Sequence, residues 1–225
     1  MFRKLVGLTT FAVSGLFLAG TASAAISGSK HDLSTYDFGT NGSIQEICVV
    51  CHAPHNNGNA QDTLLWNRAT NTTTYTPYDS PSLDDPGTPT PGATSMLCLG
   101  CHDGTVAVDS YGGATGTNFI DGQGGDFGDV AAFDANLSND HPIGITYISG
   151  TGTIWDSEMH TPSTKAITYG PSSPTTGGFV SDLLYSNKVE CASCHDVHNT
   201  KSAGNLKLLN VTNDGSTLCL SCHNK

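Results

Sequence analysis

The sequence has few of the side chains from which the interior of a protein this size is normally built. Leu, Ile, Val and Phe are sparse in a chain of 225 residues, whereas glycine is abundant at 26 residues. Thr, Ser, Asn and Asp are also frequent. Such a composition is typical of chains that stay disordered. A folded state therefore requires apolar volume from something other than the chain's own side chains.

Basic residues are scarce as well. The chain has 9 basic and 20 acidic residues, and two of the basic ones, Arg3 and Lys4, lie in the N-terminal segment described next. A surface this acidic repels nucleic acid and anionic membranes, and it favours basic proteins or metal cations as partners. We therefore expect no nucleic-acid partner.

Long apolar runs are missing except at the beginning of the chain. Arg3 and Lys4 precede an apolar run over 5–20, which ends near the small residues Ala22-Ser23-Ala24. This order is typical of a cleaved signal peptide, and the run is shorter than the roughly 20 residues that span a bilayer. We predict a signal peptide at 1–24 and an exported mature chain at 25–225 with no membrane span. It is expected to be secreted and extracellular or on the cell surface, with the periplasm as the alternative.

All eight cysteines occur in four Cys-x-x-Cys-His motifs. In an oxidising compartment, eight cysteines would ordinarily indicate disulfides, but this spacing is that of c-type haem attachment. Two thiols form thioethers with the haem, and the following imidazole reaches the iron. The pattern predicts four covalently bound haem c groups. The attachment cysteines are Cys48, Cys51, Cys98, Cys101, Cys191, Cys194, Cys219 and Cys222, and the proximal iron ligands are His52, His102, His195 and His223.

Three other interpretations of these motifs leave their number or their trailing histidines unexplained. A thioredoxin-like Cys-x-x-Cys would occur once, in a βαβ context, without an obligatory trailing histidine. Zinc ribbons use paired Cys-x-x-Cys but would leave four trailing histidines unexplained. A disulfide framework requires no histidine. Large apolar macrocycles, in contrast, would also supply the missing core.

Five of the nine histidines remain as candidates for the distal side of the irons. Four are needed if every iron has two histidine ligands, and methionine is poorly supplied, with only Met96 and Met159 beyond Met1. We predict distal ligation by His31, His55, His141 and His198. His160 is either a spare histidine or a substitute for His31. Asp32 and Asp140 are candidates to orient the neighbouring His31 and His141.

His55 and His198 each follow a proximal histidine by three residues. A linker this short cannot reach the opposite face of the same haem, so each is predicted to bind the iron of a neighbouring one. The shared pattern Cys-x-x-Cys-His-x-x-His-Asn in the first and third motifs also suggests an internal duplication. On this basis the mature chain divides into one haem pair at 25–140 and a second at 141–225.

The expected fold is mostly irregular, with a few short helices and a minor β-hairpin, wrapped around a stacked chain of four haems. Capping-box patterns predict short helices beginning at 43–46 and 187–190. Weak alternation over 143–154 predicts a hairpin. The Asp- and Gly-rich loop at 121–129 offers carboxylates but lacks the EF-hand pattern, so a solvated loop is favoured over a calcium site.

The flanks of the motifs resemble a known group of proteins. Ser29-Lys30-His31-Asp32-Leu33-Ser34, Cys48-Val49-Val50-Cys51-His52-Ala53-Pro54-His55, Cys98-Leu99-Gly100-Cys101-His102-Asp103-Gly104 and Asp140-His141-Pro142-Ile143-Gly144 resemble secreted multihaem c-type cytochromes of metal-reducing bacteria. The chain is most similar to OmcE-type tetrahaem filament cytochromes. The resemblance implies bis-histidine haems in alternating stacked and T-shaped pairs, polymerisation into an extracellular conductive filament, and one distal histidine supplied by the next subunit, for which His31 is the candidate.

The expected function is electron transfer, because an iron with two protein ligands has no open position for substrate. The expected partners are copies of the chain itself, redox proteins and an extracellular acceptor such as metal oxide. Two alternatives stay open. One is a monomeric periplasmic carrier, since five candidate histidines could serve all four haems within one subunit. The other is a small multihaem reductase with one open haem. We expect no enzymatic activity.

Overall fold

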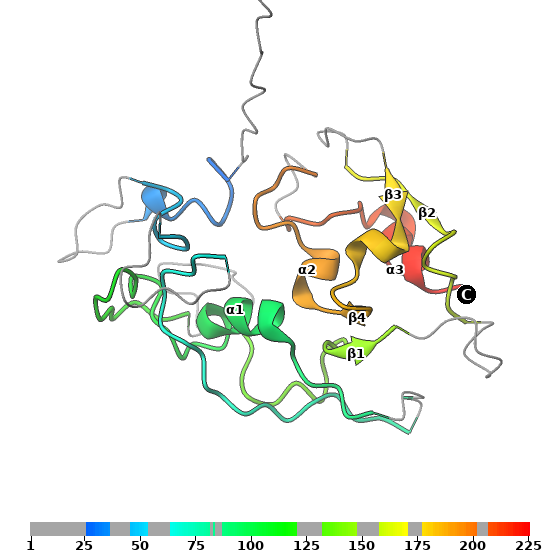
Figure 1. Ribbon diagram of the computed structural model, residues 1–225, viewed down its shortest axis with the longest axis horizontal. Helices are drawn as coiled ribbons and strands as arrows, with labels where there is room; N and C mark the ends of the chain where they lie inside the picture. The colour runs from blue at the N-terminus through cyan, green and yellow to red at the C-terminus, as the bar shows by residue number, and fades with distance from the viewer. Residues whose placement is uncertain are drawn as a thin grey trace, which may run out of the picture.

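The structure is a computed structural model that describes residues 26–36, 46–53, 64–81, 83, 87–120, 132–147, 158–170, 177–201 and 207–225. Most of this chain is irregular, as the sequence predicts, with a few short helices and two small sheets. The helical elements are η1 (Leu33–Thr35), α1 (Ala93–His102), η4 (Val180–Leu183), α2 (Cys191–Cys194), η5 (Asp214–Ser216) and α3 (Thr217–Cys222). The strands are β1 (Ile145–Thr146), β2 (Ala166–Ile167), β3 (Gly178–Phe179) and β4 (Lys188–Val189). Figure 1 shows their arrangement.

Each sheet has two antiparallel strands. β2 pairs with β3, and β1 pairs with β4 through Ile145 opposite Val189 and Thr146 opposite Lys188. The alternation over 143–154 predicted that β1 pairs with a neighbouring strand in a local hairpin. This is wrong, because the partner of β1 is β4, about forty residues further along the chain. Alternation shows that a strand has one buried face, but it does not identify the partner strand. The positions 148–154 lie outside the described residues.

The helix predicted to begin at 187–190 is also wrong. Asn187 has a left-handed backbone with φ 62°, and the next two residues form β4 because they pair with β1. The helix α2 begins only at Cys191, after Glu190, whose backbone N–H donates to Ser193 Oγ at 2.9 Å. The other helix was predicted to begin at the capping box 43–46, of which 43–45 lie outside the described residues. After it the chain makes a single turn in which the His52 N–H donates to the Cys48 carbonyl at 2.9 Å.

Two small apolar clusters replace a conventional core. The first consists of Val50, Val108 and Ile120, and the motif cysteines Cys51 and Cys101 pack against it. The second cluster consists of Tyr147, Ile167, Val180, Leu183 and Val211, with Cys222 packed against it. The buried side chains thus gather where the Cys-x-x-Cys-His motifs lie.

The helices α1 and α2 lie side by side at the centre of the molecule and join its two halves (Figure 1). The first residue before α1 is Gly92, which has no side chain to cap the helix. The cap comes instead from Glu190, whose carboxylate accepts the Gly92 N–H at 3.1–3.2 Å and the Ser95 hydroxyl. Ser95 Oγ in turn accepts the Cys191 N–H at 3.0 Å. A buried carboxylate at a helix N-terminus thereby ties the second motif to the third.

In the part of the chain that the structure describes, no helix has the length and apolar character needed to cross a membrane.

Candidate haem centres

Each Cys-x-x-Cys-His motif forms a single helical turn. The second, third and fourth motifs lie in or at the end of α1, α2 and α3, and the first forms the turn before Trp66. Residues three and four apart on such a turn face the same side. Both thiols and the imidazole of one motif therefore point toward one group. All eight cysteines are described, and none of them forms a disulfide.

Two proximal histidines are held by backbone carbonyls. His52 Nδ1 lies 2.7 Å from the Leu64 carbonyl oxygen, and His195 Nδ1 lies 2.8 Å from that of Lys207. A carbonyl oxygen only accepts hydrogen bonds, so Nδ1 has to donate. The proton on Nδ1 leaves the lone pair on Nε2 for a metal, which is the usual arrangement of metal-binding histidines.

The first and third motifs are surrounded by the same backbone contacts. Equivalent residues of the two motifs are 143 positions apart, and the same offset relates the later segments that contact them. The Ala53 N–H donates to the Leu65 carbonyl at 2.8 Å, and the Asp196 N–H donates to the Leu208 carbonyl at 2.6 Å. Leu65 and Leu208 also share the left-handed backbone, with φ 53° and 54°. The internal duplication suggested by the motifs thus extends to the segments that anchor their histidines.

A buried asparagine completes each copy of this repeat. Asn67 donates from its side chain to the Val49 carbonyl at 2.6 Å, and Asn210 donates to that of Ala192 at 3.0 Å. These return segments, 64–67 and 207–210, were not predicted from the sequence. The two segments share only a Leu followed two residues later by an Asn, repeated at the 143-residue offset that also relates the cysteines. This pattern is too short to detect without the structure.

Three histidine rings predicted as distal ligands lie beside proximal ones. The ring centres of His31 and His102 are 6.1 Å apart, and those of His198 and His52 are also 6.1 Å apart. The centres of His141 and His223 are 6.4 Å apart. His198 thus lies beside the proximal histidine of a motif other than its own, as its spacing predicts.

This separation fits an iron between the two rings. An imidazole nitrogen binds a transition metal at about 2 Å, and the ring centre lies roughly one ångström beyond that nitrogen. Two imidazoles on opposite sides of one iron therefore stand about 6 Å apart, centre to centre. The three pairs have this spacing, so the residues present fit a haem c with two histidine ligands in each of these places.

His31 shows this fit in a second way. Its Nδ1 is buried without a hydrogen-bond partner among the described residues, a state that costs stability unless a partner is supplied. Burial and the neighbouring His102 lower the pKa of His31 to about 4, which keeps the ring neutral and able to bind metal. The suggestion that Asp32 orients His31 is wrong, because its carboxylate accepts hydrogen bonds from Gly28 and Ser34 instead.

His141 is oriented by the backbone rather than by Asp140. Its Nδ1 lies 3.1 Å from the carbonyl oxygen of Pro142, which again leaves Nε2 for a metal. Burial, with the neighbouring His141 adding to it, lowers the pKa of His223. The neutral imidazole, the form that binds metal, is therefore favoured at His223.

A tight turn presents His198. Asp196 accepts the His198 N–H at 3.2 Å, and its other carboxylate oxygen accepts the Thr200 and Lys201 N–H groups at 2.7 and 2.9 Å. Asn199, inside this turn, has a left-handed backbone with φ 52°. These bonds direct residue 198 away from its own motif and toward His52.

His55, the remaining predicted distal ligand, lies outside the described residues. Within the described ranges, His195 has no histidine ring beside it, and His160 is likewise not paired with a proximal ring. His160 lies near the fourth motif through its backbone, whose N–H donates to the Cys222 carbonyl at 2.8 Å. Its carbonyl accepts the Tyr147 hydroxyl at 2.8 Å. This position is that of the spare histidine in the sequence prediction.

The attachment cysteines form a continuous series through the molecule. Cys51 and Cys101 pack on the same apolar cluster. The thiols of Cys98 and Cys191 are within hydrogen-bonding reach, and this contact and burial raise the pKa of Cys98. Burial and the proximity of Cys222 raise the pKa of Cys194 to about 11. Attachment cysteines of successive motifs therefore lie near one another.

The described residues contain no group of three or more His, Cys, Asp or Glu side chains arranged to hold a bare metal ion. The acidic loop at 121–129 lies outside the described residues.

Comparison with known proteins supports the haem interpretation for the C-terminal region. Residues 186–225, which contain the third and fourth motifs, match the family model of the doubled CXXCH motif. No curated protein matches the chain. Residues 186–225 are thus a region like those of multihaem c-type cytochromes, in which CXXCH motifs imply covalently bound haem c and a role in electron transfer.

Proposed function

We propose that the chain is an exported tetrahaem electron-transfer protein in which every iron has two histidine ligands. The proposed pairs are His52 with His198, His102 with His31, His223 with His141, and His195 with His55. The spacing of the three described ring pairs, 6.1–6.4 Å, is the observation that carries this proposal. His55 is assigned to His195 because it occupies in the first repeat the position of His198 in the third motif.

Haem c supplies reversible one-electron chemistry when bound, and the chain determines how it is used. Two histidine ligands leave no open position, so substrate cannot bind. The neutral histidines and the nearby carboxylates favour low reduction potentials. The proximity of Cys51 to Cys101, of Cys98 to Cys191 and of Cys194 to Cys222 supports electron transfer between the haems of successive motifs.

Two measurements test this function. Mass spectrometry of the intact exported protein is expected to find four covalent haems and loss of residues 1–24. Visible and EPR spectra of the oxidised protein should contain only low-spin signals, and the reduced protein should not bind CO. Fewer than four haems would contradict the tetrahaem proposal.

The alternative is a small reductase with one open haem. A high-spin signal from one haem in four of the wild-type protein would support the reductase and contradict the pure carrier.

We further propose that the carrier delivers electrons outside the cell and assembles with copies of itself. The support is the resemblance of its motif flanks to filament-forming cytochromes. In the structure His31 lies beside His102 of its own chain, so an inter-subunit ligand is not needed for this pair. Electron microscopy of the secreted fraction would test the filament, and the monomeric periplasmic carrier predicts none.

The variant His31→Ala separates the two origins of this ligand. If His31 serves its own chain, the variant has four haems, one of them high-spin, in the dilute monomer. If His31 reaches the next subunit, the wild-type monomer is already partly high-spin and becomes low-spin on assembly, whereas the variant forms no filaments.

A further inference from the structure

Arg68 is a cation buried in the N-terminal half, with 3% of its surface exposed. Nη1 donates to the carbonyls of Val50 and Val108 at 3.2 and 3.0 Å, and Nη2 donates to that of Ala107 at 2.6 Å. These three acceptors are neutral. The guanidinium is therefore solvated by backbone dipoles and keeps its full charge, since arginine does not lose its proton in proteins.

Among the described residues, no carboxylate forms a salt bridge with this charge. The single salt bridge among the described residues joins Lys225 to Glu158. Asp109, the carboxylate next in sequence to one of the acceptors, is bound by the N–H groups of Thr117 and Asn118 at 2.9–3.2 Å. Within the described ranges Arg68 thus has no acidic side chain within 4 Å.

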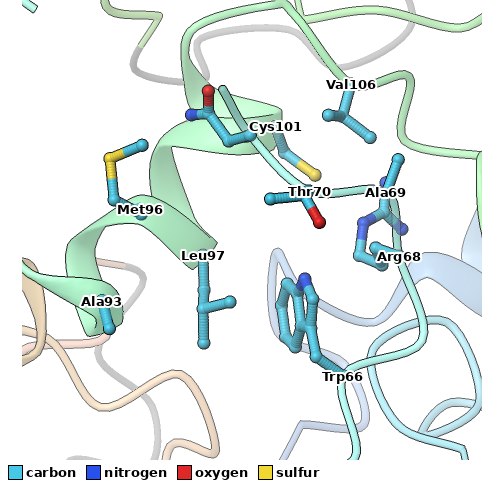
Figure 2. Close-up of a pocket in the computed structure, with 11 residues that line it drawn as sticks. Trp66, Arg68, Ala69, Thr70, Ala93, Met96, Leu97, Cys101 and Val106 are labelled. Atoms are coloured by element: carbon cyan, nitrogen blue, oxygen red, sulfur yellow. The ribbon is translucent and has the colours of Figure 1, made fainter. Parts of the chain in front are cut away.

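The buried charge lies next to two haem-attachment cysteines. Its acceptor Val50 immediately precedes Cys51, and Cys51 and Cys101 pack on the same apolar cluster as Val50. Arg68 and Cys101 also line one pocket beside α1, in which Trp66 and Leu97 face each other (Figure 2).

The internal repeat provides a natural comparison. At the offset of 143 that relates the two copies, the residue equivalent to Arg68 is Val211. Val211 is fully buried, and Cys222 packs against the same cluster. The two halves thus place a cation and an apolar side chain, respectively, at the same point of the repeat.

The two halves also differ in their overall charge. Positions 25–140 contain 14 acidic and 2 basic residues, whereas 141–225 contain 6 acidic and 5 basic residues. The second basic residue of the first half, Lys30, is exposed. Water and salt screen surface charges strongly and buried charges much less. Arg68 is therefore the one buried positive charge that opposes the acidic N-terminal half.

We propose that Arg68 raises the reduction potentials of the haems attached through Cys51 and Cys101, and so offsets the acidic residues of its half. The proposal rests on the proposed electron-transfer function. Reduction adds one electron to an iron and lowers its charge by one, so a fixed cation nearby favours the reduced state. Without it, the first two haems would have lower potentials and would pass electrons to the other pair but accept them poorly.

Two variants separate charge from hydrogen bonding. Arg68→Gln keeps side-chain N–H donors for the carbonyls but removes the charge, and Arg68→Lys keeps the charge. A unit charge on the order of 10 Å from a redox centre, at an effective dielectric of about 20, changes the reduction equilibrium roughly tenfold. Tenfold corresponds to ~59 mV for one electron. Potentiometric titration of the intact exported protein, with dithionite as reductant and ferricyanide as oxidant, measures the four midpoints.

The expected result is that two of the four midpoints fall in Arg68→Gln and stay in place in Arg68→Lys. A matched control, Val211→Met, should move none of them. Equal shifts in both Arg68 variants, or no shift in the glutamine variant, would overturn the proposal. Arg68→Val, which copies the second repeat, replaces the glutamine variant if that fails to bind four haems. If only cationic residues allow haem attachment, Arg68 serves folding and the proposal is wrong.

Haem content, measured first by mass spectrometry, keeps this test separate from the proposed function. Fewer than four haems in the wild type contradicts the tetrahaem carrier. Four low-spin haems with unmoved midpoints contradicts only the role of Arg68.

Discussion

His198 lies beside His52 with nearly parallel rings, their centres 6.1 Å apart and their planes 21° apart, although 146 positions separate them in the sequence. The contact joins the third motif to the haem centre of the first. The two halves of the chain therefore share a centre, and neither half forms the proposed set of ligands alone.

Replacing His198 should affect one haem only. The variant His198→Ala removes the proposed distal ligand of the first iron and leaves it five-coordinate, so about a quarter of the haem should become high-spin and bind CO when reduced. Visible and EPR spectra measure both. The control is His160→Ala, which removes the histidine that has no proximal ring beside it. Equal high-spin fractions in the two variants would contradict the pairing.

The ring-plane angles predict two kinds of low-spin EPR signal. Near-parallel imidazoles act on the same iron d orbital and split it from its partner, whereas crossed imidazoles leave the two orbitals nearly equal in energy. The planes of His52 and His198 are 21° apart, and those of the other two pairs are 66° and 74° apart. We expect one rhombic signal and two of large g anisotropy from these pairs. Loss of the rhombic signal in His198→Ala assigns it.

Removing the carboxylate that joins the halves should destabilise the protein. Glu190 has 3% of its surface exposed and caps α1 through Gly92 and Ser95. Glu190→Ala is expected to lower the free energy of unfolding by about 2–3 kcal/mol, because it leaves buried donors unpaired. Guanidinium denaturation measures the change. In the control Glu158→Ala, which removes the surface salt bridge to Lys225, the change should be below about 1 kcal/mol.

A glycine next to the His141 segment should tolerate no side chain. Gly144 has φ +74°, and a Cβ there would overlap the backbone of Thr90. We expect Gly144→Ala to cost more than about 3 kcal/mol of unfolding free energy. Gly112→Ala is the matched control, because Gly112 has φ +62° with open space around it, and should cost about 1–2 kcal/mol from backbone strain alone. Similar losses in both would show that Thr90 moves aside.

The prediction from sequence was most successful where a local pattern defines the chemistry. The four motifs and the position of His198 beside another motif follow from spacing along a few residues, and the mostly irregular fold follows from the composition. The helix at 187–190 and the local hairpin were wrong because both depend on the partner of β1. Arg68 and Glu190 were missed because a single charged residue in a polar sequence carries no sign of its burial.

The sequence by itself determined the attachment chemistry, because two thiols and an imidazole within five residues need no tertiary structure to point to one group. It also determined that the apolar interior had to come from elsewhere. Only the tertiary structure decided which histidine lies beside which, since His31, His141 and His198 reach their partners through long-range contacts. It likewise decided the difference between Arg68 and Val211, because the effect of a charge depends on how far it lies from water.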